Sequence, residues 1–159
     1  MFFKEFRIRP ATNNDIPSIR EVVFSSLREF ALLPELTGKD QDLIDIEKSY
    51  LSNDGLFGVA VDIKTNRIVG TFGLFRIDED VCELRKMYLF KEVRGKGLGN
   101  FILQTAVVIA KEKHFKKIML ETISPLTAAI SLYKKFGFKE TRPGKINARV
   151  DQAFELDIR

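Results

Sequence analysis

An arginine, a lysine and three glycines are interleaved at residues 94–99, within the stretch "VRGKGLGN". This stretch separates an apolar run from a long series of apolar residues at helical spacing. Glycine allows backbone torsions that are closed to other residues and lets a ligand approach the main chain, but it costs conformational entropy. At a junction between a strand and a helix, unpaired N–H groups and the helix dipole bind anions. The pattern therefore predicts backbone amides that surround a pyrophosphate.

Two common phosphate motifs do not fit this stretch. A P-loop has the pattern G-x-x-x-x-G-K-[ST], and Leu98, Gly99 and Asn100 do not supply its lysine and hydroxyl. A dinucleotide fingerprint needs a glycine at the position of Asn100. The spacing that remains is R-x-x-G-x-G, formed by Arg94, Gly97 and Gly99. A tight turn without a ligand is the structural alternative, but the interleaved cations favour an anion site.

Two other side chains are candidates for proton transfer. Glu83 lies in the strand-like run 81–90, where a carboxylate can act as a base. Alternatively, Glu83 is an exposed carboxylate that pairs with Arg85 or Lys86. Tyr133 can donate a proton from its hydroxyl, or its helical spacing can make it a core aromatic. The sequence leaves both pairs of alternatives open.

The composition excludes several classes of site and partner. With Cys82 and His114 as the single residues of their types, we expect no internal disulfide and no metal site, and we interpret Cys82 as a small buried strand residue. The net charge of +4 is mild and no aromatic-plus-basic motif is present, so we expect no nucleic-acid partner. No apolar run reaches membrane-spanning length and the first residues lack the apolar segment of a secretory signal. We therefore expect a cytoplasmic protein without a membrane partner.

The predicted elements alternate between strands and helices in a single domain over residues 1–159. The strands are expected at 6–12, 56–62, 67–77, 81–90, 117–123, 138–141 and 153–159. The helices are expected at about 15–30, with Asn14 or Asp15 as its cap, and at 41–51, 98–113 and 125–136. The order β-α-α-β-β-β-α-β-α-β-β predicts an α/β fold with a mixed sheet.

Three segments of the sequence resemble the GCN5-related N-acetyltransferase (GNAT) superfamily. Residues 93–103 match its acetyl-CoA motif, [R/Q]-x-x-G-x-[G/A] after a strand. The segment 82–90 is similar to the family's central strand, with Glu83 eleven positions before Arg94. The segment 128–140 is similar to its closing helix and strand, including Tyr133. The resemblance covers roughly half of the chain and implies a mostly antiparallel sheet whose parallel central strands splay around acetyl-CoA, with helices on both faces.

The resemblance also implies a reaction and a set of roles. Acetyl-CoA would be the co-substrate, and a primary amine of a small molecule, peptide or protein would attack its thioester directly. Residues implied to contact the pyrophosphate are Arg94, Gly95, Lys96, Gly97, Leu98, Gly99 and Asn100. Residues implied to contact the pantetheine arm through their backbone are Met87, Tyr88 and Leu89, with an amide near Leu89 facing the acetyl oxygen. Glu83 would act as the base, through a water, and Tyr133 as the acid for the CoA sulfur.

One position departs from the family pattern. Many relatives carry an asparagine after the strand at 117–123, where it contacts the pantetheine arm, whereas this chain has Ser124 followed by Pro125. Ser124 is retained as a cofactor-binding candidate. Alternatively, serine followed by proline is a typical N-cap and N1 pair at the start of a helix.

The acceptor amine is the part of the reaction that the sequence leaves open. The family resemblance places the acceptor site at the loop 31–40 and the segment 141–152. Acidic residues there that could attract a cationic amine are Glu35, Asp40 and Asp151. Basic residues there that could hold a carboxylate are Arg142, Lys145 and Arg149. The resemblance also makes a homodimer possible, because the family often forms one. Two other functions stay open: a non-catalytic acyl-CoA-binding regulatory domain and a nucleic-acid-associated module.

Overall fold

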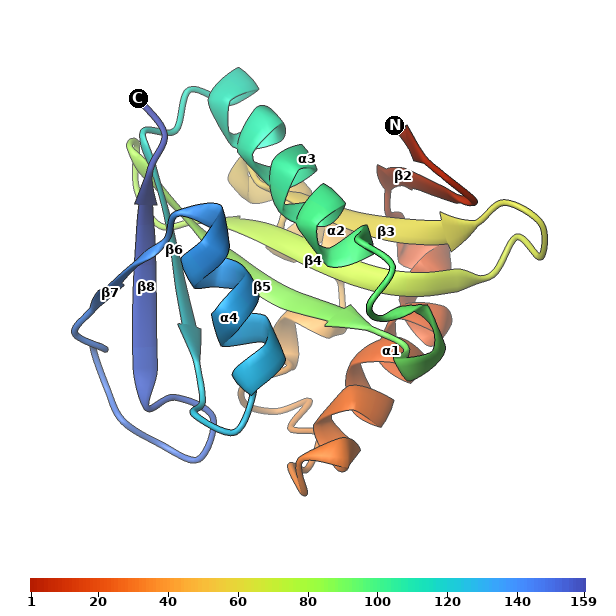
Figure 1. Ribbon diagram of the computed structural model, residues 1–159, viewed down its shortest axis with the longest axis horizontal. Coiled ribbons are helices and arrows are strands. Elements are labelled where there is room, and N and C mark those ends of the chain that lie inside the picture. The colour runs from red at the N-terminus through yellow and green to blue at the C-terminus, as the bar shows by residue number, and fades with distance from the viewer.

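Eight strands form one sheet in the computed structural model, which describes residues 1–159 (Figure 1). Their order in space is β1-β2-β3-β4-β5-β6-β8-β7. The strands are Phe2–Phe3 (β1), Phe6–Pro10 (β2), Leu56–Asp62 (β3), Ile68–Arg76 (β4), Val81–Leu89 (β5), Lys117–Thr122 (β6), Lys139–Thr141 (β7) and Gln152–Asp157 (β8). All neighbouring strands are antiparallel except β5 and β6, which are parallel. The predicted mixed, mostly antiparallel sheet is confirmed.

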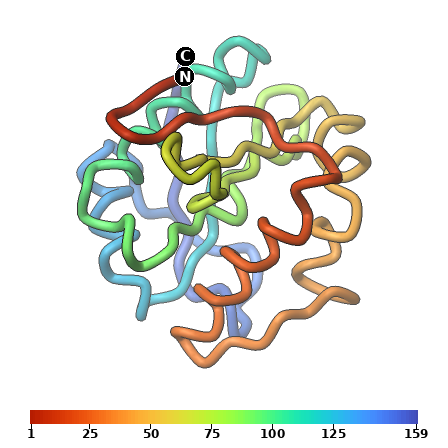
Figure 2. Tube along the Cα trace, turned by 90° about the vertical axis from the view of Figure 1, so that its right-hand side faces the viewer, coloured from red at the N-terminus to blue at the C-terminus, as the bar shows by residue number.

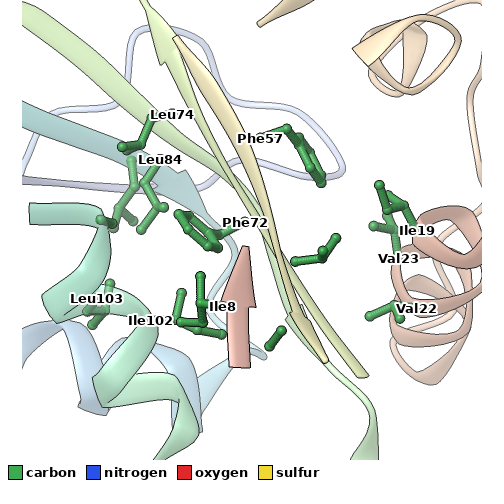
Figure 3. Close-up of a cluster of buried hydrophobic side chains, with 14 of the residues drawn as sticks. Ile8, Ile19, Val22, Val23, Phe57, Phe72, Leu74, Leu84, Ile102 and Leu103 are labelled. Carbon is green, nitrogen blue, oxygen red and sulfur yellow. The ribbon is translucent and has the colours of Figure 1, made fainter. Parts of the chain in front are cut away.

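Four α-helices cover the two faces of this sheet. They are Ile16–Glu29 (α1), Ile46–Ser49 (α2), Leu98–Glu112 (α3) and Thr127–Phe136 (α4). Figure 2 turns the molecule by 90° and separates α3 and α4 from α1 and α2 across the sheet. In Figure 3, Ile19 and Val22 of α1 lie toward Phe57, whereas Ile102 of α3 lies beside Phe72. Helices on both faces, as expected from the resemblance, therefore enclose one continuous core.

The start of α1 follows the signals in its sequence. Asp15 is the N-cap, and Pro17 lies in the first turn, where a missing N–H costs no hydrogen bond. The Asp15 carboxylate also accepts a 2.9 Å hydrogen bond from the backbone N–H of Thr12 and forms an ion pair of 2.8 Å with Arg9. Together, these contacts fix α1 relative to the end of β2.

One local prediction is wrong, and one short strand was not predicted. The helix expected at 41–51 is broken into a 3-10 turn at 41–43, the short α2, and a second 3-10 turn at 51–53. The break lies at Asp45, which is extended and accepts a hydrogen bond from the N–H of Lys48, while Asn13 accepts from the N–H groups of Ile46 and Glu47. These side chains compete with a continuous helix, as short polar side chains commonly do. The sequence also gave no signal for the two-residue strand β1.

Candidate active site

A gap opens between the two parallel strands at the centre of the sheet. The pairing of β5 with β6 comprises three positions: Val81–Lys117, Cys82–Ile118 and Glu83–Met119. Farther along, β5 remains paired with β4 and β6 with β8, so that the two strands diverge (Figure 1). A cleft of about 820 Å³ lies at this divergence and is also lined by residues of α1, α4 and the glycine loop 94–100. The predicted splay of the central strands is therefore present.

An extra residue in β5 changes which side chains face the cleft. Gly73 pairs with Arg85 and Thr71 with Tyr88, so β5 has one more residue than β4 between these pairs. Lys86 lies in this bulge with a φ of 52°, and its carbonyl accepts a 2.7 Å hydrogen bond from the Thr71 hydroxyl. Because side chains alternate along a strand, the bulge brings Tyr88 to the same face as Arg85, the face covered by α1 and α2.

The end of β5 presents main-chain groups to the gap. The N–H of Phe90 donates to the carbonyl of Val69 over 2.9 Å, and the next pair along the ladder is Leu89 with Gly70. Hydrogen-bonded and non-hydrogen-bonded pairs alternate in an antiparallel ladder, so the N–H and C=O of Leu89 point away from β4. The carbonyl accepts a 3.0 Å hydrogen bond from Nε of Arg94, and the N–H faces the divergence from β6.

The glycine loop carries six consecutive unpaired amides. Gly95 and Gly97 have φ values of 75° and 87°, in the left-handed region that glycine adopts without strain. Gly97 is the N-cap of α3, and the first N–H to find a backbone acceptor is that of Phe101, which donates to the Gly97 carbonyl over 3.1 Å. The N–H groups of residues 95–100 have no acceptor within the chain. This arrangement, at the positive end of a helix dipole, is suited to an anion.

The side chains of the loop divide between the cleft and the rest of the molecule. Arg94 lines the cleft and forms an ion pair of 2.8 Å with Glu29 of α1. Lys96 is directed to Glu5, with Nζ 3.9 Å from its carboxylate, and the Leu98 side chain is buried in the core. Lys96 and Leu98, both predicted to bind the cofactor, therefore offer a ligand in the cleft their backbone amides and not their side chains. Gly95, Gly97, Gly99 and Asn100 line the cleft, as do the predicted pantetheine-binding residues Met87, Tyr88 and Leu89.

Glu83 lines the cleft and is ion-paired. Its carboxylate accepts a hydrogen bond from Nε of Arg85, and 13% of its side chain is exposed. The Arg85 guanidinium in turn lies 3.8 Å from the ring centroid of Phe75, so it is held between an anion and an aromatic face. The pairing with Arg85 that the sequence offered as an alternative is present, and the carboxylate nevertheless reaches the site.

A second carboxylate, Glu121 of β6, lines the same cleft and was not predicted. It has no ion-pair partner within the chain, and burial, followed by the charge of Glu83, raises its pKa. The signal for it was present in the alternation of β6: Met119 pairs with Glu83, so Glu121, two residues on, shares the face of Glu83. That inference requires knowledge of the strand pairing, which the sequence alone did not provide.

Tyr133 is a core aromatic residue that also lines the cleft. Its ring packs in the core, with centroids 5.8 Å from Phe138 and 6.4 Å from Phe154. The residue also lines the cleft, and its hydroxyl makes no hydrogen bond within the chain. Burial, with a smaller contribution from Tyr88, raises the pKa of the Tyr133 hydroxyl, which is therefore protonated at neutral pH. The protonated hydroxyl is available as a hydrogen-bond donor.

The profile of the Acetyltransferase (GNAT) family matches residues 21–138. The chain belongs to the GNAT family of acetyltransferases. The uncharacterized N-acetyltransferase YjgM of Escherichia coli K12 is 33% identical to this GNAT enzyme over 137 residues, which is 83% of this chain and 81% of that protein. Human N-acetyltransferase 8B is 32% identical over 106 residues, or 63% of this chain and 46% of its own length. The chain thus spans about half the length of this vertebrate relative.

Solved GNAT structures share the fold over nearly the whole chain. An acetyltransferase of the GNAT family from Staphylococcus aureus Mu50 superposes with a TM-score of 0.88 and 26% identity, over 97% of this chain and 99% of that chain. The PaiA N-acetyltransferase of Thermoplasma acidophilum, solved in complex with coenzyme A, has a TM-score of 0.77 and 24% identity over 96% and 98% of the two chains. YncA of Salmonella typhimurium, solved with acetyl-CoA, has a TM-score of 0.77 and 18% identity over 98% and 95%.

Ser124 of this GNAT enzyme is engaged outside the cleft. Its hydroxyl donates to the Asp151 carboxylate over 3.0 Å, and its N–H donates to the same group over 2.8 Å. Because α4 begins at Thr127 with Leu126 as N-cap, the alternative interpretation of Ser124 and Pro125 as N-cap and N1 is wrong. Pro125 and Leu126 line the cleft where the sequence reasoning placed Ser124.

Several charges predicted to meet the acceptor neutralise one another instead. Arg149 donates to both Asp40 oxygens, over 2.7 and 2.8 Å, and Asp151 is bonded to Ser124. Asp40 and Arg149 are therefore not free to bind a substrate amine or carboxylate. The charges that line the cleft without an ion-pair partner are Glu121 and Lys39.

Three further features of the chain concern metal binding, the single cysteine and membrane-spanning helices. No three or more His, Cys, Asp and Glu side chains are grouped so that they could hold a metal ion. Cys82 is fully buried, as predicted, and burial raises the pKa of its thiol to about 12. None of the helices combines the length and apolar character needed to cross a membrane.

Proposed function

We propose that this acetyltransferase moves the acetyl group of acetyl-CoA to a primary amine of a small molecule or peptide, by direct attack of the amine on the thioester. The observation that carries the proposal is the run of six unpaired amides at residues 95–100, which opens onto the cleft between β5 and β6. Relatives in fold were solved with coenzyme A or acetyl-CoA, which supports the same co-substrate here.

The residues of the cleft fit the parts of acetyl-CoA in a consistent order. The amides at 95–100 would bind the pyrophosphate, with the N-terminus of α3 adding its partial positive charge. The exposed backbone of Met87 and Leu89 would pair with the amide groups of the pantetheine arm. The N–H of Leu89 would then donate to the acetyl oxygen and stabilise the negative charge that develops there during attack.

Proton transfer from the amine requires a carboxylate near the site of attack. Glu83 and Glu121 both line the cleft, but Glu83 already accepts from Arg85, whereas Glu121 has no ion-pair partner and a raised pKa. A base with a raised pKa binds the proton of an ammonium more readily. We therefore assign the role of general base to Glu121. Glu83 would place a second carboxylate near the ammonium form of the acceptor amine.

The departing thiolate needs a hydrogen-bond donor, and Tyr133 meets this need. Tyr133 lines the cleft, and its hydroxyl is protonated at neutral pH and has no hydrogen-bond acceptor in the chain. Donation to the sulfur of CoA would lower the barrier to its departure. The same ring is held by Phe138 and Phe154, which keeps the hydroxyl at a fixed position.

The test is thiol release from acetyl-CoA over a panel of amines, with calorimetric titration of CoA alongside. Amino acids, polyamines, aminoglycosides and peptides cover the acceptor classes. We expect CoA to bind and one class to be acetylated. Tight CoA binding without thiol release on any amine would contradict the transfer reaction and favour a regulatory acyl-CoA-binding domain. Absence of CoA binding would contradict the assignment of the glycine loop.

A further inference from the structure

One buried carboxylate joins three segments at the end of the cleft that lies away from the glycine loop. Asp40, in the connection between α1 and α2, has a side chain with 0% exposure. It binds Arg149, from the connection between β7 and β8, over 2.7 and 2.8 Å. It also binds Nζ of Lys86, from the bulge of β5, at 3.1 Å. The N–H of Glu35 donates to Asp40 over 2.7 Å.

The two cations are held by more than this carboxylate. Nζ of Lys86 lies 3.3 Å from the Asp42 carboxylate and donates to the carbonyl of Lys39 over 2.9 Å. Asp42 also accepts a hydrogen bond from the Tyr50 hydroxyl. Arg149 donates to the carbonyl of Leu33 over 2.6 Å. The side chains of Lys86 and Arg149 are only 11% and 13% exposed.

These four charged residues, Asp40, Asp42, Lys86 and Arg149, are named the Asp40 cluster. Two carboxylates face two cations, so the cluster is neutral as a set. Removal of one member leaves a buried charge without compensation. Since buried ion pairs contribute little stability beyond that of an apolar core of the same shape, the cluster is better explained by the positions that it fixes.

The segments that the cluster joins have few other constraints. Residues 31–40 and 142–151 contain no helix or strand. Within 142–151, Asn147 and Val150 form one bridge, and Asp151 at the end of the segment is bonded to Thr122 and Ser124. Both segments line the cleft, through Gly38 and Lys39 on one side and Arg149 and Val150 on the other. The third segment is the bulge that determines which groups of β5 face the cleft.

We propose that Asp40 and Arg149 are positioning residues for the acceptor: their ion pair closes the two acceptor-side segments over the cleft and, through Lys86, sets them at a fixed distance from the acetyl-binding edge of β5. The inference rests on the proposed function, because it assigns the acceptor to this end of the same cleft. Neither residue needs to touch the reacting atoms. Their effect is to hold the walls against which the amine is oriented.

The test compares Arg149→Met and Arg149→Lys with Arg159→Met, an exposed arginine whose partner is Asp157 at the end of β8. The substrates are acetyl-CoA and the amine that the wild-type enzyme acetylates best in the panel. We expect Arg149→Met to lower kcat/KM for the amine by about tenfold to about 100-fold, mainly through KM, because misplaced walls cost orientation. The affinity for CoA should stay within about twofold of wild type in both variants.

The lysine variant sharpens the interpretation. Lysine keeps the charge but cannot form the bidentate pair with Asp40 and reach the Leu33 carbonyl at once, so we expect an intermediate kcat/KM. Arg159→Met should match the wild type. Arg149→Met could lower the melting temperature and still leave KM for the amine unchanged when it is assayed well below that melting temperature. In that case the role of Arg149 is only structural and the inference is overturned.

Hydrogen exchange provides a readout that does not depend on activity. Amides in 31–40 and 142–151 should exchange faster in Arg149→Met than in wild type, while those of α3 and β4 should not change. Unchanged exchange in both segments would overturn the inference even if no amine were acetylated. Failure of the proposed function is a separate result, namely the absence of thiol release by the wild-type enzyme.

Discussion

The two ends of the cleft are built from different parts of the chain. The proposed cofactor end consists of backbone N–H groups from one continuous stretch, residues 95–100, together with Leu89. The proposed acceptor end is held by side chains that are far apart in sequence, such as Asp40 and Arg149, which are 109 residues apart. A backbone site depends on local torsions and tolerates many side chains, whereas a side-chain site depends on a specific pair. This difference predicts that the two ends respond to different kinds of substitution.

The largest effect is expected at the cofactor end, from Gly95→Asp. A Cβ at Gly95 meets no atom within 4 Å, and asparagine and aspartate tolerate a positive φ better than most residues. The new carboxylate would face the pyrophosphate, and like charges in contact should weaken CoA binding on the order of 100-fold. Calorimetric titration with CoA measures the change.

Gly95→Asn is the matched control, because it has the shape and torsional preference of the aspartate without its charge. It should bind CoA much more tightly than Gly95→Asp. Equal losses in the two variants would mean that the space at Gly95, rather than the negative charge, matters, and would argue against a pyrophosphate at this loop.

The next effect concerns the carboxylates between the two ends. Glu121→Gln should lower kcat by about 100-fold, because it removes the proposed base, and Glu83→Gln by about tenfold. In the wild type, kcat/KM should fall as the pH decreases through the raised pKa of Glu121, since only the deprotonated form accepts a proton. This limb should disappear in Glu121→Gln. A limb that persists there and is lost in Glu83→Gln would reverse the two assignments.

A smaller effect is expected on the free energy of unfolding at low pH, through Asp40. Burial acts to raise the pKa of Asp40, but hydrogen bonds from Arg149 and from the Glu35 N–H, together with Lys86, lower it to about 2. Since the folded pKa lies below the unfolded one, this stabilisation is complete above about pH 4 and is lost as the pH falls toward 2, for a total of about 2 kcal/mol. Urea unfolding across this range should show a steeper loss in wild type than in Arg149→Met. Parallel curves would contradict the pairing.

The smallest effect is expected at Ser124. Because its hydroxyl is bonded to Asp151, Ser124→Ala should lower the free energy of unfolding by about 1 kcal/mol. The CoA affinity should change by less than about twofold, since the hydroxyl does not contact the cleft. A CoA affinity that falls as far as in Gly95→Asp would return Ser124 to the cofactor site that the sequence suggested.

The same contrast explains what the sequence could predict. The order of the elements follows from periodicity, and the left-handed torsions of Gly95 and Gly97 agree with the glycine motif, whereas the splayed strands were implied by the family resemblance. Glu121 was missed because its role depends on the register between β5 and β6. The pairing of Asp40 with Arg149 is not predictable from local sequence, because nothing local indicates that loops 109 residues apart meet. The break at Asp45 is a competition between side-chain and helical hydrogen bonds, which periodicity does not measure.

The bulge at Lys86 has a consequence for anyone who redesigns this enzyme. A regular strand would look like an improvement, because removing one residue from β5 would restore an uninterrupted ladder with β4. The deletion would also turn every later side chain of the strand to the opposite face, so that Tyr88 would leave the acceptor side and Leu89 would no longer present its N–H in the same direction. Length changes confined to exposed loops leave the strand register unaltered. At this position, the number of residues determines which groups of β5 face the cleft.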